Sequence, residues 1–202
     1  MTFHIAVLAS RQGSNLEAIL KNIQTGRLSA QTSCVISDNP KAKALKIAEA
    51  HHVPTHIIEA QNLNRENFDR LLIAKLQEYP IDLIVLAGFM RLLTPTFLAA
   101  YPNKVINIHP ALLPAFKGLH AQRQTIEYGA KIAGCTVHFV DAGTDSGPII
   151  AQQVVPVLQN DTEASLSERI LVSEHQLYSE VIEKFAQGKV HLQGRKVKVE
   201  YY

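Results

Sequence analysis

Two polar residues stand within a segment that is otherwise apolar. Residues 105–114 read VINIHPALLP, and Asn107 and His109 are two positions apart within them. If this segment begins as a buried strand, the two side chains leave the same face of that strand. An amide can donate to a developing oxyanion, and an imidazole can exchange a proton with reacting groups. The pair predicts attack on a carbonyl, although a lone histidine at a strand end is more often structural.

A carboxylate that could act with this pair lies in the later segment DAGTDSGP, residues 141–148. Asp145 could point back at His109, but aspartate and glycine in such a segment could also do no more than shape a turn. A turn is the default interpretation for Asp141. For His138, on the preceding predicted strand, a core histidine is the safer interpretation.

A short loop between a predicted strand and a predicted helix is a candidate anion site. In LASRQGSNLEAIL, residues 8–20, Ser14 and Glu17 have the spacing of a capping box, which would close the helix start with side chains. Alternatively, the free N–H groups and the positive end of the helix dipole would bind a phosphate. The spacing favours neither alternative, and the loop is neither a Walker A motif nor GxGxxG.

Two further segments could contribute to a ligand site. Glu174 lies on the apolar stripe of a long predicted helix, where a buried carboxylate needs a partner. It would accept hydrogen bonds from ligand hydroxyls or form an internal salt bridge. The segment AGFMRLL, residues 87–93, follows a buried strand and is either core or an apolar slot for a flat ring at a sheet edge.

The remaining sequence predicts the elements that would position these residues. Apolar strands alternate with amphipathic helices, which indicates an α/β fold of the Rossmann-like kind, with a mostly parallel twisted sheet and helices on both faces. Strands are expected at 3–9, 33–37, 53–58, 83–87, 104–109, 135–140 and 149–157. Helices are expected at 15–23, after residues 38–40, at 66–77, in parts of 89–101 with an interruption at Pro95, at 121–128 and at 161–186. C-terminal antiparallel strands follow at 190–201, and the absence of any linker predicts one domain over residues 1–202.

Composition excludes several classes of protein. The 202 residues carry a formal net charge of only +2 without a basic tract, which argues against a nucleic-acid partner. Apolar runs are too short to cross a bilayer, and the N-terminus does not resemble a signal peptide, so we expect a cytoplasmic protein. Cys34 and Cys135 form no CxxC pattern and are expected to be reduced core residues. No metal is implied, because H-x-E and CxxC spacings do not occur.

In this order, the motifs resemble the phosphoribosylglycinamide formyltransferase family. The matching segments are GSN at 13–15, AGFMRLL at 87–93, NIHPALLPAFKGLH at 107–120, TVHFVDAGTDSGPII at 136–150 and SEHQLY at 173–178. The resemblance implies transfer of a formyl group from 10-formyltetrahydrofolate to the amine of glycinamide ribonucleotide in purine biosynthesis. It also implies direct attack by that amine, small-molecule partners alone, and a monomer or homodimer.

The resemblance assigns a role to each matching position. Asn107, His109 and Asp145 would carry the chemistry by stabilising the tetrahedral intermediate. The other roles are phosphate binding by Gly13, Ser14 and Asn15, contact with ribose hydroxyls by Glu174, and a folate site lined by Arg65, Met90, Arg91, Leu92, Leu93 and Asn107. One departure is Arg11, which stands where the family usually has glycine, so either the turn is reshaped or that position never required a positive φ.

Three alternatives remain open from the sequence. Formyltetrahydrofolate deformylase uses water as the acceptor and typically has an N-terminal regulatory domain, which is not expected here. Methionyl-tRNA formyltransferase carries an additional C-terminal domain, for which this chain is expected to be too short. A dinucleotide-binding module would be expected to contain GxGxxG. The candidate phosphate loop favours a phosphorylated acceptor over water.

Overall fold

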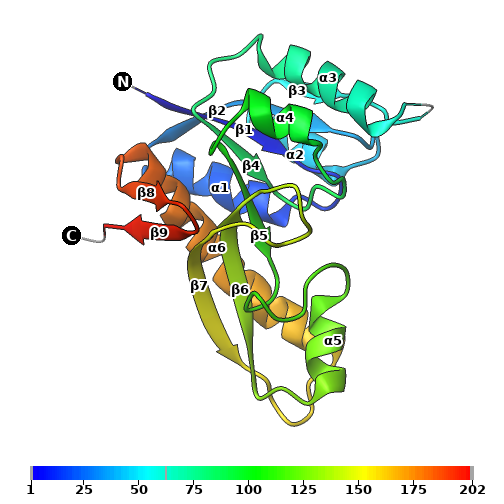
Figure 1. Ribbon diagram of the computed structural model, residues 1–202, viewed down its shortest axis with the longest axis vertical. Coiled ribbons are helices and arrows are strands. Elements are labelled where there is room, and N and C mark those ends of the chain that lie inside the picture. The colour runs from blue at the N-terminus through cyan, green and yellow to red at the C-terminus, as the bar shows by residue number, and fades with distance from the viewer. Residues whose placement is uncertain (1, 62, 201–202) are drawn as a thin grey trace. The chain divides into compact units, whose positions relative to one another are not determined.

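The computed structural model describes residues 2–61 and 63–200, which form two compact units (Figure 1). The first unit runs to Asn107, and the second begins at Ile108. Strand β5, Val105–His109, contains the boundary between them. Whether the chain is one domain, as the sequence predicts, stays a prediction.

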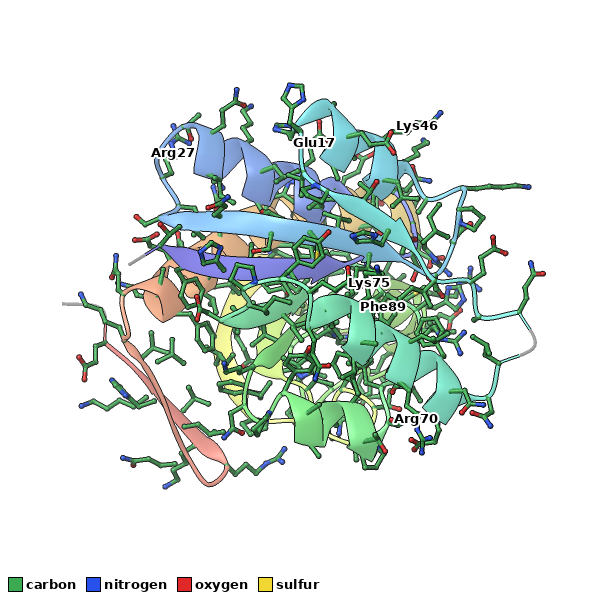
Figure 2. The ribbon with its side chains drawn as sticks, turned by 90° about the horizontal axis from the view of Figure 1, so that it is seen from above. Glu17, Arg27, Lys46, Arg70, Lys75 and Phe89 are labelled. Carbon is green, nitrogen blue, oxygen red and sulfur yellow. The ribbon has the colours of Figure 1, made fainter. Side chains whose placement is uncertain are left out.

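The first unit is a parallel sheet covered by helices. Its elements are β1 (Phe3–Leu8), α1 (Ser14–Gln24), β2 (Ala30–Ser37), α2 (Lys43–Ala50), β3 (Thr55–Ile57), α3 (Arg65–Leu76), β4 (Leu83–Leu86), α4 (Pro95–Ala100) and the start of β5. The strands are ordered β3-β2-β1-β4-β5, and every neighbouring pair is parallel. Figure 2 shows α1 and α2 on one side of β1 and β2, and α3 and α4 on the other. Covering both faces explains why these strands are continuous apolar runs.

The register of the first sheet brings three predicted ligand-binding segments to one edge of that sheet. Leu8 of β1 pairs with Leu86 of β4, and Leu86 pairs with Asn107 of β5. Because the strands are parallel, the loops 9–13 and 87–94 leave the sheet at the level of Asn107. Open α/β sheets bind ligands at this carboxyl edge.

The second unit is a long helix packed on an antiparallel pair of strands. Its elements are α5 (Ala121–Tyr128), β6 (Ile132–Phe139), β7 (Ile149–Pro156), α6 (Glu163–Ala186), β8 (Val190–Gln193) and β9 (Lys196–Val199). Strands β6 and β7 are antiparallel, as are β8 and β9, and α6 contacts both β6 and β7 (Figure 1). The expected end of the hairpin, Tyr201, lies outside the described residues.

The expected fold class is confirmed: the sheet is mostly parallel, helices pack against it, and the C-terminal strands are antiparallel. One helix expectation is wrong. Pro95 does not interrupt a helix over 89–101 but begins α4, and residues 89–94 form no helix. Proline suits the first helical position, since its fixed φ matches the helix and its missing N–H would have no intrahelical partner there.

The two cysteines are the buried thiols that the sequence predicts. Both are free and buried. Burial, as the largest effect, raises the pKa of Cys34 and of Cys135 to about 12. Both therefore remain protonated at neutral pH and are poor nucleophiles. Across the described residues, no helix has the length and apolar character needed to cross a membrane.

Arg169 anchors the start of α6. Its guanidinium donates to both carboxylate oxygens of Asp161, at 2.7 and 2.9 Å. Asp161 also accepts from the backbone N–H of Leu158 and from the hydroxyl of Ser165. The hydrogen bonds from Arg169, as the largest effect, hold the pKa of Asp161 well below its ordinary value of 3.8. The carboxylate form of Asp161 is therefore favoured by folding.

We expect Arg169→Gln to be less stable than the wild type at neutral pH, with a difference that shrinks in acid. A depressed pKa in the folded state adds stability that is present above the unfolded pKa and lost as the pH falls through the folded value. The difference in unfolding free energy should therefore narrow progressively below pH 3.8. Urea unfolding followed by circular dichroism at several pH values checks this.

The matched control for that experiment is Lys75→Gln, which removes an exposed bridge to Glu78 on the surface of the first unit. Exposed pairs of this kind contribute little, so its effect on unfolding should be close to zero. A stability difference for Arg169→Gln that stays constant from neutral pH to about pH 2 would contradict the assignment.

Candidate active site

Strand β5 carries Asn107 and His109. Ile106 is fully buried and Ile108 is nearly so, which anchors the strand through its apolar residues. His109 is also buried, whereas Asn107 is half-buried. Alternation along the extended strand places the two polar side chains on one face, opposite the two isoleucines. The local backbone therefore presents an amide and an imidazole side by side, as the sequence predicts.

His109 and Asp145 are in contact in the second unit. His109 Nδ1 lies 3.3 Å from Asp145 Oδ2, and the carboxylate is only 13% exposed. On its other side, His109 Nε2 donates to the carbonyl oxygen of Phe116 at 2.8 Å. Asp145 Oδ2 also accepts from the N–H of Gly118 at 2.8 Å. Both ring nitrogens face oxygen acceptors, so a protonated His109 can donate to both.

The shape of its loop positions Asp145. The residue has φ +46, a left-handed conformation that aspartate tolerates better than most side chains. Two residues later, a Cβ on Gly147 would overlap the carbonyl oxygen of Phe139, so only glycine lets the chain pass there. Asp141 accepts from the hydroxyl of Ser146 at 2.7 Å, which is the turn role expected for it. The loop is thus held by local contacts while Asp145 faces the imidazole.

His138 belongs to the same cluster, which the sequence alone did not predict. Its Nε2 lies 3.7 Å from Asp145 Oδ1, and its Nδ1 lies 2.8 Å from the carbonyl oxygen of Phe139. A carbonyl only accepts, so the neutral ring carries its proton on Nδ1, and its Nε2 is an acceptor. Burial, as the largest effect, lowers the pKa of His138 below 6.5, which favours this neutral form at neutral pH. In this neutral form, His138 Nε2 has no proton to donate to Asp145 Oδ1.

Thr136, two residues before His138 on β6, holds the loop that follows β5. Its hydroxyl donates to the carbonyl of Ala111 at 2.7 Å and accepts from the N–H of Leu113 at 3.0 Å. Gln152 on β7 donates to the carbonyl of Leu113 at 2.9 Å. These bonds fasten the turn after His109 to the antiparallel strands. The alternation of two polar side chains on an otherwise apolar strand was the sequence signal that could have revealed this role.

The candidate phosphate loop lies in the first unit and ends in an uncapped helix start. Gly13 is the N-cap of α1, with φ +77 and no side-chain hydrogen bond at the cap. The alternative of a capping box from Ser14 to Glu17 is wrong, because Ser14 is already the first helical residue. The N–H groups of this turn are therefore not closed off by an N-cap side chain, as an anion site requires.

Close packing against α2 explains the glycine at position 13. A Cβ there would stand 2.8 Å from the Cα of Ala44, which is backbone and cannot turn away. The Ala44 N–H donates to the carbonyl of Arg11 at 3.3 Å and holds the loop against the helix. Arg11 itself is not among the residues with positive φ. Its side chain therefore strains no turn, and the position does not require a positive φ in this chain.

The segment AGFMRLL is partly core and partly exposed. Phe89 and Leu93 are buried, whereas Met90 is 45% exposed and Leu92 is 53% exposed. The two exposed side chains are large and apolar, and they flank Arg91. The two buried residues fit the core alternative. Contact of the exposed Met90 and Leu92 with a ring stays a prediction.

Helix α3 supports this segment from one side. Arg65 Nη2 donates to the carbonyl of Leu92 at 3.1 Å. The guanidinium of Arg91 lies 4.3 Å from the centre of the Phe68 ring, and that ring stacks with Phe89, which is labelled in Figure 2. Cation–π contact and stacking fix the segment without regular structure. Of the residues predicted to line a folate site, Arg65 and Leu92 are therefore in direct contact, and Arg91 packs on Phe68 of α3.

Glu174 is buried on α6, as predicted. Its carboxylate lies close enough to Cys135 for its charge to contribute, after burial, to raising the pKa of that thiol. Its contact with ligand hydroxyls stays a prediction. Asn107, the phosphate loop and the folate segment belong to the first unit, and His109, Asp145 and Glu174 to the second. Across the described residues, no group of three or more His, Cys, Asp or Glu side chains is arranged so that it could hold a metal ion.

Comparison with known proteins gives a consistent family assignment. The profile of the family described as formyl transferase matches residues 3–182. A phosphoribosylglycinamide formyltransferase of Bacillus subtilis is 43% identical over 180 residues, covering 89% of this chain and 92% of the relative. The crystal structure of glycinamide ribonucleotide transformylase 1 from Symbiobacterium toebii is 48% identical with a TM-score of 0.95, covering 98% of this chain and 94% of that one.

A protein with a different acceptor is also similar in structure. The formyltetrahydrofolate deformylase from Pseudomonas syringae has a TM-score of 0.92 but only 26% identity. The match covers 98% of this chain and 66% of that one. The fold is therefore shared by the two classes, and the difference in identity favours the transferases.

Proposed function

Because the chain belongs to the formyl transferase family, we propose that it transfers the formyl group of 10-formyltetrahydrofolate to the amine of glycinamide ribonucleotide. The observation that carries the choice of acceptor is the start of α1. Its N-cap is a glycine with φ +77, which supplies no side-chain hydrogen bond to the helix start. Such a helix start suits a phosphate monoester, whereas a water acceptor would need no anion site.

The proposed chemistry uses the groups on β5 and the loop after β6. The neutral amine attacks the formyl carbon, and the amide of Asn107 and the Nε2–H of His109 donate to the resulting oxyanion. For His109, this oxygen replaces the Phe116 carbonyl that accepts the same hydrogen bond in the free protein. Asp145 supports the protonated imidazole and helps the amine proton move to the folate nitrogen as the bond between that nitrogen and the formyl carbon breaks.

The proposed ligand contacts are those that the family resemblance implies. Gly13, Ser14 and Asn15 would hold the phosphate, and Glu174 would meet the ribose hydroxyls. Arg65 and residues 90–93, together with Asn107, would line the folate site. The proposal also includes a cytoplasmic location, no metal requirement, and a monomer or homodimer.

One assay tests the acceptor. Purified protein is mixed with 10-formyltetrahydrofolate and glycinamide ribonucleotide, and release of tetrahydrofolate is followed with time. We expect release only when the ribonucleotide is present. The dephosphorylated riboside should react with a KM raised by about 100-fold, because it lacks the group that meets the helix start.

Two results of this assay would point elsewhere. Equal release without any ribonucleotide would identify a deformylase. A riboside that reacts as well as the ribonucleotide would leave formyl transfer standing but remove the phosphate site at α1.

A further inference from the structure

Ser10 connects three loops at the carboxyl edge of the first sheet. It follows β1 and is 5% exposed. Its N–H donates to the carbonyl of Gly88 at 3.2 Å, and its Oγ accepts from the N–H of Met90 at 3.0 Å. Its own carbonyl accepts from the side chain of Asn39 at 3.2 Å. One small residue thus joins the loop before α1 to the loop after β4 and to the loop before α2.

The bond from the Met90 N–H to Ser10 supports the folate segment in addition to the contacts from α3. On the α3 side, that segment is held by Arg65 at Leu92, and the buried Asp69 accepts from the N–H of the following Thr94 at 2.6 Å. Residues 87–94 contain no helix or strand, so such individual bonds set their conformation. A buried backbone N–H without a partner is unfavourable, so losing the Ser10 hydroxyl would loosen the segment around Met90.

We propose that Ser10 is a positioning residue that couples the phosphate site to the folate site. This rests on the proposed function, because it takes residues 13–15 as the phosphate site and residues 90–93 as part of the folate site. A phosphate that orders residues 10–15 also orders the Oγ of Ser10, and through it the N–H of Met90. Each ligand therefore favours binding of the other through a contiguous, partly buried hydrogen-bond connection.

Ser10→Ala isolates this connection. Alanine removes only the Oγ acceptor and retains both backbone bonds, to Gly88 and from Asn39. The dissociation constant of tetrahydrofolate is measured by calorimetry with and without saturating inorganic phosphate, an anion too small to reach the folate itself. We expect phosphate to tighten tetrahydrofolate binding about fivefold in the wild type and by no more than about 1.5-fold in Ser10→Ala.

Two variants separate coupling from general destabilisation. Ser10→Thr keeps the hydroxyl and should retain the coupling. Ser33→Ala is the matched control, since Ser33 is a buried serine of the same unit whose hydroxyl donates to the Pro80 carbonyl at 2.8 Å. It should also retain the coupling. In turnover, Ser10→Ala should raise the KM for 10-formyltetrahydrofolate about fivefold while kcat changes by less than about twofold.

The outcomes distinguish this inference from the proposed function. Coupling that persists in Ser10→Ala, or is lost equally in Ser33→Ala, overturns the role of Ser10. A wild type that binds both ligands and transfers formyl groups without coupling overturns the inference alone. A wild type that binds no tetrahydrofolate and transfers no formyl group overturns both.

Discussion

Asp145→Asn is expected to lower kcat about 1000-fold while the protein remains folded. The carboxylate lies 3.3 Å from His109 Nδ1 and is the negative charge that would stabilise the imidazolium as the oxyanion forms. The asparagine side chain has the same shape as aspartate and can still accept from the N–H of Gly118. We therefore expect the loop to keep its conformation. Single-turnover formyl transfer measured beside a thermal unfolding curve separates the chemical loss from any loss of structure.

The control for this variant lies in the same loop. Asp141→Asn changes a carboxylate whose partners are the Gly143 N–H and the Ser146 hydroxyl, both within the turn. Its kcat should stay within about threefold of the wild type. Comparable losses for the two aspartates would mean that the loop as a whole, and not Asp145, is required.

A double variant tests whether Asp145 acts through His109. His109→Ala alone is expected to lower kcat by a similar factor of about 1000. If the carboxylate works by supporting the imidazolium, Asp145→Asn should change little once the imidazole is gone, since residues that act as a unit are far from additive. Full additivity of the two losses would show that Asp145 handles the proton independently of His109.

Gly13→Ala is expected to impair both folding and ribonucleotide binding. The residue has φ +77, which costs a non-glycine side chain about 1–2 kcal/mol. The new Cβ would also stand 2.8 Å from the Cα of Ala44, so the loop or α2 must shift. We expect the unfolding free energy to fall by about 2–3 kcal/mol and the KM for the ribonucleotide to rise at least about tenfold.

The opposite end of α1 offers a matched control. Gly26 has φ +72, but a Cβ there would meet nothing within 4 Å. Gly26→Ala should therefore show the strain alone, about 1 kcal/mol, with an unchanged KM. Urea unfolding and steady-state kinetics on both variants make the comparison. If the two alanines had equal effects on stability and KM, close packing against Ala44 would have no part in the site.

Local patterns in the sequence predicted most elements of the fold. The helix expected at 121–128 has those bounds in the structure, and the strand expected at 104–109 begins one residue later. The strand prediction rests on its apolar run, which depends only on neighbouring residues. Contacts between distant segments were harder to predict. Contact between Asp145 and His109 was only one of two interpretations of that loop, the other being a turn role for the aspartate. The contact of His138 with the same carboxylate was not predicted.

The predicted starts of two helices were wrong for local reasons. The backbone conformation and the capping contacts decide where a helix begins, and a residue pattern does not show them. Ser14 and Glu17 have the spacing of a capping box, yet the helix begins at Ser14 because Gly13 adopts the left-handed N-cap. Pro95 looked like an interruption and is a start, because Thr94 caps α4 by accepting from the N–H of Phe97. The bonds of Ser10 follow from the register of β1 against β4, which no short motif encodes.

The hydrogen bond from His109 to the Phe116 carbonyl limits how much the imidazole can add to substrate affinity. In the free protein the Nε2–H already donates to a neutral carbonyl oxygen at 2.8 Å. Exchanging it for the neutral oxygen of a formyl group replaces one such bond by another, so this donor adds little to ground-state affinity. A negatively charged oxygen accepts a markedly stronger bond. On the proposed mechanism, the imidazole would therefore discriminate between substrate and transition state, and its removal would change kcat far more than KM.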